Sequence, residues 1–323
     1  MKMRVAQIAL CLICLMFPIV SLPQSQQGIP GVLAVGRQPV AVAINPITGQ
    51  AFVLNRGSQD VVVVDLRSRS VVAKYLIGGS PEGIAVNPQT NQVVVANLNS
   101  AVTIIDQRKG EIVATIPAGK APSRVAIDTK RNTALVTNFN GSNMVVIDLA
   151  ALKVVSTIPL KNGPLGIAVL EDTRSAVIAQ QYDMELVQIN LDSGAVVKVL
   201  NIGRYLSEAA ANPQTGMVVV GNPSSNGIMT VYDPVQNSIA ATLAVGAGPL
   251  YVSVYPKRNV ALVSEYNSDT VSLVDLKLNR VIRSMPVAKG PSGLAIDPAT
   301  GIALVTNRLN DSVTFLDLEA LLK

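Results

Sequence analysis

Six aspartates recur along the chain at intervals of about 42 residues, with an asparagine where a seventh would fall. They are Asp65, Asp106, Asp148, Asp233, Asp275 and Asp317, with Asn190 in the gap. Carboxylates are the ligands that hard divalent cations prefer, so a converging set of them would bind a metal. Each of these residues, however, closes an apolar run in a different copy of the repeat, so we expect the carboxylates to lie far apart and away from any central axis. We therefore predict that their side chains accept hydrogen bonds from turn N–H groups, and we predict no metal site.

The rest of the composition excludes several classes of catalytic and metal-binding site. The chain of 323 residues contains no histidine, which excludes histidine-based acid–base catalysis, Ser-His triads and histidine-ligated metals or haem. Its two cysteines, Cys11 and Cys14, both lie near the N-terminus, so the rest of the chain has no disulfide and no thiol nucleophile. The glycines do not form a phosphate-binding loop. We accordingly expect no cofactor.

A proline that returns about every 42 residues marks an internal repeat. The anchors are Pro39, Pro81, Pro122, Pro164, Pro249 and Pro291, with Leu206 at the position of the missing proline. In the second copy the anchor opens an apolar run, Gly83–Val86, and an Asn-Pro turn follows at Asn87. Three further short apolar runs separated by turn residues complete the copy. Seven copies of a four-strand unit at this period predict an all-β, seven-bladed β-propeller.

The two ends of the chain complement each other in this fold. Only 32 residues follow Pro291, which suffices for three strands, whereas the segment 32–36 resembles the fourth strand of other copies. We predict that this N-terminal strand closes the last blade and removes two exposed strand edges. Residues 1–25 resemble a secretory signal, with Lys2 and Arg4 before an apolar stretch, and an uncleaved anchor is the alternative. The predicted organisation is a signal peptide at 1–25, a linker at 26–28 and the propeller at 29–323.

The repeat text resembles a known family. Ala134–Asn138 and Ala303–Asn307 both read Ala-Leu-Val-Thr-Asn, and each is followed by a loop and a run that ends in Asp. With the Gly-x-x-Pro linkers, this text is similar to the YVTN-type β-propeller repeat over residues 29–323. The resemblance implies a YncE-like exported propeller, periplasmic or at the cell surface. It carries no shared catalytic motif, and some relatives are linked to single-stranded DNA binding and others to adhesion.

The residues that break the repeat are the candidates for recognition. The second position after the anchor is small in four copies but becomes Arg124, Glu208 and Tyr251 in copies three, five and six. The asparagine that ends the second strand becomes Glu265 in copy six. These positions belong to one face, formed by the interblade linkers and the loops between second and third strands, which we call the loop-rich face. Arginine and aromatic clusters are typical of recognition surfaces. The predicted ligand-binding residues are Arg124, Tyr182, Arg204, Tyr205, Glu208, Tyr251, Glu265 and Tyr266.

Three functions are compatible with these residues. The first is an exported, non-catalytic propeller that binds an envelope protein, a glycan or an anionic polymer, with its site off-centre over copies three to six. The second is a lactonase-like hydrolase with a central divalent metal, for which Glu208, Glu265 and the asparagines would supply ligands. The third is single-stranded DNA binding by Arg124, Arg204, Tyr205 and Tyr266. The net charge of +5 falls to +3 without Lys2 and Arg4, which is too small to indicate nucleic acid alone.

Overall fold

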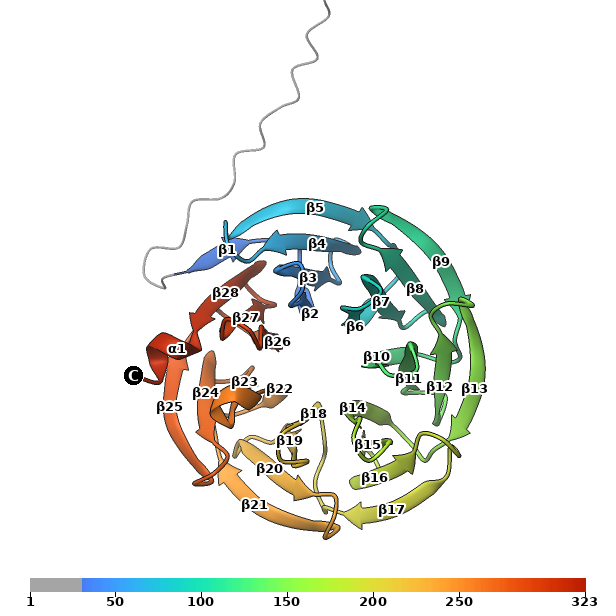
Figure 1. The fold of residues 1–323 in the computed structure, drawn as a ribbon. Helices are drawn as coiled ribbons and strands as arrows, with labels where there is room; N and C mark the ends of the chain where they lie inside the picture. The colour runs from blue at the N-terminus through green and yellow to red at the C-terminus, as the bar shows by residue number, and fades with distance from the viewer. Residues whose placement is uncertain (1–30) are drawn as a thin grey trace, which may run out of the picture.

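The computed structural model describes residues 31–323, in which seven four-stranded antiparallel sheets surround a central axis (Figure 1). The all-β, seven-bladed propeller is thereby confirmed. The predicted signal peptide (1–25), the linker (26–28) and the first two residues of the predicted propeller range lie outside the described residues. Within residues 31–323 no helix has the length and apolar character needed to cross a membrane.

The first four blades follow the repeat in order. Their strands are β2 (Pro39–Asn45), β3 (Gln50–Asn55), β4 (Asp60–Asp65) and β5 (Ser70–Leu76); β6 (Pro81–Asn87), β7 (Gln92–Asn97), β8 (Ala101–Asp106) and β9 (Glu111–Pro117); β10 (Pro122–Asp128), β11 (Thr133–Asn138), β12 (Asn143–Asp148) and β13 (Lys153–Pro159); β14 (Pro164–Leu170), β15 (Ser175–Gln180), β16 (Glu185–Asn190) and β17 (Val196–Asn201).

The last three blades contain the remaining strands and two short helices. They are β18 (Ala209–Ala211), β19 (Val218–Asn222), β20 (Ile228–Asp233) and β21 (Ser238–Ala244); β22 (Pro249–Tyr255), η1 (Pro256–Arg258), β23 (Val260–Glu265), β24 (Thr270–Asp275) and β25 (Arg280–Pro286); β26 (Pro291–Ile296), β27 (Ile302–Asn307), β28 (Ser312–Asp317), α1 (Leu318–Leu321) and β1 (Val32–Ala34).

The ring closes as the sequence predicts. β1 pairs antiparallel with β28, with Val32 opposite Thr314 and Ala34 opposite Ser312, and the sheet order is β1-β28-β27-β26. Leu33 packs against the apolar cluster between the last and first blades, beside Phe315. The N-terminal strand therefore joins the last blade by both hydrogen bonds and burial.

Apolar packing between neighbouring blades holds the ring together. The described residues, 31–323, form seven buried clusters, one for each pair of adjacent blades. Between blades one and two, for example, Phe52 and Leu54 of β3 pack against Val93 and Val95 of β7. Because both faces of each sheet are covered, the strands carry nearly continuous β-branched and aliphatic runs rather than an alternating pattern.

The repeated aspartates have the structural role that the sequence predicts. The Asp106 carboxylate accepts the backbone N–H groups of Arg108 and Lys109 at 2.9 and 3.2 Å. In the same way, Asp275 accepts the N–H groups of Lys277 and Leu278. Backbone hydrogen bonds of this kind stabilise the ionised carboxylate and lower the pKa of Asp148. Each of these residues ends a third strand and caps the turn that follows.

The fifth blade departs from the others at its inner strand. β18 has only three residues, and Leu206, which replaces the anchor proline, is fully buried in the cluster between the fourth and fifth blades. The Glu208 backbone N–H donates to the carbonyl of Leu250, on the neighbouring blade, at 3.3 Å. The Gly166 N–H of the fourth blade donates in the same way to the carbonyl of Ser207, so Glu208 contacts the sixth blade as the equivalent residue of the fourth blade contacts the fifth.

Candidate functional site

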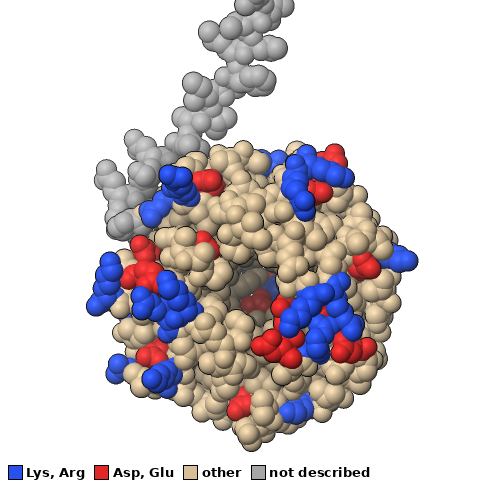
Figure 2. Space-filling view, viewed as in Figure 1, with Lys and Arg blue, Asp and Glu red and all other residues tan. Residues whose placement is uncertain are grey.

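The inner strands place the unusual residues around the central channel. Each inner strand starts at the loop-rich face and runs toward the opposite face, which carries the turns between first and second strands and which we call the turn face. The channel is visible as a hollow at the centre of the disc, with acidic and basic side chains in its depth (Figure 2). The candidate site is therefore an axial one, and its residues come from several blades.

The second position after the anchor allows a side chain only in some blades. A Cβ on Gly83 would lie 2.3 Å from the carbonyl oxygen of Ser123, and one on Gly166 would lie 2.5 Å from that of Ser207. Glycine is required there because the next inner strand passes so close. In blades three, five and six the same position holds Arg124, Glu208 and Tyr251, which all line the channel.

Four charged side chains form a ladder across the channel. Arg124 Nε lies 2.7 Å from Glu208 Oε2, and Arg124 Nη1 lies 3.3 Å from Glu82 Oε1. Glu82 in turn pairs with Arg56, from the loop between β3 and β4. The Arg124 and Glu208 side chains are only 11% and 13% exposed, so this pair is largely shielded from water. Alternating charges thus connect the first, second, third and fifth blades.

Tyr251 adds an aromatic wall to this ladder. The Arg124 guanidinium lies over its ring, 4.8 Å from the centroid, in a cation–π contact. The ring also packs against apolar clusters on both sides of the channel, between blades six and seven and between blades one and two. Burial raises the pKa of Tyr251 to about 12, although the nearby Arg124 opposes the shift. The phenol therefore stays protonated at neutral pH and can donate a hydrogen bond.

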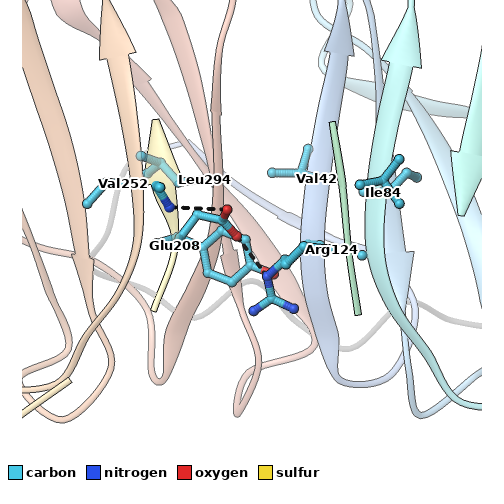
Figure 3. A pocket seen from close by; sticks show the side chains of 11 residues that line it. Val42, Ile84, Arg124, Glu208, Val252 and Leu294 are labelled. Carbon is cyan, nitrogen blue, oxygen red and sulfur yellow. Dashed lines mark hydrogen bonds and ion pairs between the residues drawn. The ribbon is translucent and has the colours of Figure 1, made fainter. Parts of the chain in front are cut away.

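A cavity of about 140 Å³ adjoins Arg124, Glu208 and Tyr251. Its walls are apolar side chains from the third position after each anchor, one residue nearer the turn face than Arg124, Glu208 and Tyr251. They are Val42, Ile84, Val125, Val252 and Leu294. Figure 3 shows Arg124 and Glu208 on one side of the cavity and Val42, Ile84, Val252 and Leu294 on the other. The axis thus has an apolar section and a charged section.

The charged section has an excess of positive charge. Arg56 and Arg308 occupy equivalent positions on the loops of blades one and seven, and each backbone N–H donates to the neighbouring linker. Burial lowers the pKa of Arg56, and the charges of Arg308 and Arg124 lower it further. Arg56 Nε is buried and finds no hydrogen-bond partner within residues 31–323. Three arginines therefore share the channel mouth with two glutamates, Glu82 and Glu208.

The other predicted ligand-binding residues lie away from this ladder or inside a blade. Tyr182 and Tyr205 are 56% and 53% exposed on the loop-rich face, and Tyr182 packs its ring against Phe139 with centroids 5.2 Å apart. Arg204 is also exposed, and Tyr266 is half-buried. Of the eight predicted residues, the structure brings together Arg124, Glu208 and Tyr251.

Glu265 has a structural role inside its own blade. It is fully buried, and its carboxylate accepts the Gly246 backbone N–H at 2.7 Å and the Thr270 hydroxyl. Gln180 makes the equivalent bond to the N–H of Lys161 at 2.7 Å, and Asn97 accepts the N–H of Ser80. This position ties the second strand to the incoming linker in several blades, so Glu265 is not part of the candidate site.

Sequence reasoning missed Glu82 as a site residue. The available signal was its charge, because the first position after the other anchors is apolar or serine. The pairing register shifts between Pro81 and Gly83, so Glu82 is the extra residue of a β-bulge. A bulge re-aims the side chain it carries, and here it directs Glu82 toward two arginines.

Comparison with known proteins supports the fold. No family model matches the chain, and no curated protein matches it either. Among solved structures, the chain is similar to one from Kuenenia stuttgartiensis hydrazine synthase, with a TM-score of 0.81. The identity is 18%, and the match covers 92% of this chain and 99% of that one. At such an identity the likeness establishes the propeller architecture alone.

Proposed function

We propose that this chain is an exported, non-catalytic propeller of the YVTN-type, YncE-like kind, which binds an envelope protein through its loop-rich face. The observation that carries the proposal is the charged ladder from Arg56 to Glu208. Buried charges cost folding free energy unless they are paired, and apolar groups of the same volume often stabilise a core better. Folding alone gives no reason for arginine and glutamate at positions that are small in four other blades.

Aromatic and apolar groups on the same face favour a protein as the partner. Tyr182, Tyr205 and Leu309 are each more than half exposed, and all three belong to loops or linkers of this face. Large side chains of this kind supply most of the affinity in protein interfaces, and tyrosine does so at a low cost in conformational entropy. Glycans and anionic polymers are the alternative partners, and crosslinking in the cell distinguishes them from a protein.

The placement of the acidic groups does not favour a metal-dependent hydrolase. The Glu208 carboxylate is engaged by Arg124, and that of Glu265 is engaged inside its blade. Within residues 31–323 no three acidic, histidine or cysteine side chains gather at one point. Likewise, Arg124 faces carboxylates in the channel rather than a strand-binding groove, so nothing specific favours single-stranded DNA.

Site-specific photo-crosslinking in the producing cell tests the proposed face. A photoreactive amino acid would replace Tyr205 or Leu309 on the loop-rich face, and Gln89 or Gln214 on the turn face as matched exposed controls. We expect protein adducts from the first two positions and none from the controls. Equal adducts from both faces, or adducts from the turn face alone, would contradict the proposal. Adducts to a glycan or to an anionic polymer would show that the partner belongs to that class and is not a protein.

A further inference from the structure

We infer that the channel mouth is a binding site for a single carboxylate group, held between Arg56 and Arg308 beside Tyr251. The inference deepens the proposed binding role and rests on it for the choice of face. It begins from the balance of charge at the mouth. Arg56, Arg124 and Arg308 contribute three positive charges, and Glu82 and Glu208 contribute two negative charges. One positive charge is left over.

The surplus charge is located on the side of blades one and seven. Arg124 is held by both glutamates, and Arg56 is held by Glu82 alone. Arg308 forms no ion pair with any carboxylate of residues 31–323, and its charge lowers the pKa of Arg56. Two partly buried arginines that repel each other, of which only Arg56 pairs with a carboxylate, form a local site at which an added anion relieves the repulsion.

The geometry of the groups favours a carboxylate over other anions. A guanidinium presents a planar fork of N–H donors that matches the two oxygens of a carboxylate. Arg56 Nε is a buried donor without a partner in the described chain, so a ligand oxygen would satisfy it. The protonated Tyr251 phenol can supply a further donor. A monoanion also neutralises the mouth, whereas a phosphate dianion would leave it with a net negative charge beside Glu82.

An acetate titration of the purified protein tests this site. The arginine Nε–H resonances of ¹⁵N-labelled protein would be followed in a buffer of low ionic strength, with chloride and phosphate titrated separately. We expect saturable binding of acetate that is tighter than that of either inorganic anion. Arg308→Gln should weaken acetate binding at least about tenfold, as expected for the loss of one charge-assisted contact. Arg308→Lys should restore part of the lost affinity for acetate. Lys120 is an exposed cation of the same face, so Lys120→Gln should leave the affinity unchanged.

The outcomes separate the carboxylate site from the proposed function. Absence of saturable acetate binding, an unchanged affinity in Arg308→Gln, or tighter binding of phosphate would each overturn the site, and face-specific crosslinks would still support the binding role. Crosslinks from both faces would overturn the binding role whatever acetate does. If acetate binds as expected, Arg308→Gln in the crosslinking assay identifies the source of the carboxylate. Loss of adducts assigns it to the partner protein, and retained adducts assign it to a free small acid.

Discussion

Arg124 Nε and Glu208 Oε2 lie 2.7 Å apart across the channel, although the two residues are 84 positions apart in sequence and belong to blades three and five. The contact connects two blades that are not neighbours in the ring. Glu82 and Arg56 extend the connection to blades two and one. The site therefore depends on the closed ring, because no single blade or adjacent pair of blades contains it.

Breaking this pair on one side should destabilise the protein strongly. Glu208→Leu leaves Arg124 largely buried with one partner fewer, and the loss of one member of a buried pair costs about 3–5 kcal/mol of unfolding free energy. The double variant Arg124→Met/Glu208→Leu should recover much of that loss because no isolated charge remains near the sixth blade. Urea unfolding of the three proteins measures the difference. A double variant less stable than Glu208→Leu would show that the pair contributes net stability.

Glu265 should tolerate an amide but not a truncation. Glu265→Gln keeps an oxygen for the Gly246 N–H, as Gln180 does for Lys161 in the fourth blade, so we expect less than about 1 kcal/mol of destabilisation. Glu265→Ala removes the acceptor and should cost about 1–3 kcal/mol. Thermal or urea unfolding distinguishes the two. A large loss in Glu265→Gln would indicate that the charge itself is needed at this position.

Stability should fall in alkaline solution, and Tyr251 should contribute to the fall. Its pKa of about 12 in the folded protein exceeds the usual value of 10, because burial disfavours the phenolate. The unfolded chain therefore loses its proton first, so the stabilisation is complete below pH 10 and is lost as the pH rises to about 12. Tyr251→Phe should remove part of this dependence, about 1–3 kcal/mol between those limits. The control is unfolding between pH 7 and 9. In that range the unfolding free energies of the wild-type protein and of Tyr251→Phe should change with pH to the same extent.

Removal of the N-terminal strand should open the ring. β1 supplies the fourth strand of the last blade, and Leu33 packs beside Phe315. Deletion of residues 23–36 exposes the edge of β28 and should lower the unfolding free energy by roughly several kcal/mol. Leu33→Ala should lower the unfolding free energy by part of this amount. Val72 occupies an exposed position on β5, so Val72→Ala should lower the unfolding free energy only slightly. An unchanged melting temperature in the deletion would contradict the closure.

The local parts of the fold could be predicted because they repeat. Each aspartate such as Asp106 ends a strand and caps a turn within a few residues, and the segment that closes the ring resembles the fourth strand of other copies. The ladder could not be predicted because its contacts form across the axis. They depend on the ring radius and on the bulge that re-aims Glu82. Glu265 likewise resembled a surface residue, because the sequence alone does not show that its side chain points back to Gly246.

The uncompensated positive charge at the channel mouth is the feature on which the binding site depends, and anomalous scattering can locate it directly. Bromide is a monoanion whose position in a crystal is identified without ambiguity. A crystal of the wild-type protein soaked in bromide should show an anomalous peak between the guanidinium groups of Arg56 and Arg308, and a crystal of Arg308→Gln should lack it. Bromide at exposed lysines and arginines with none at the channel mouth would contradict the site.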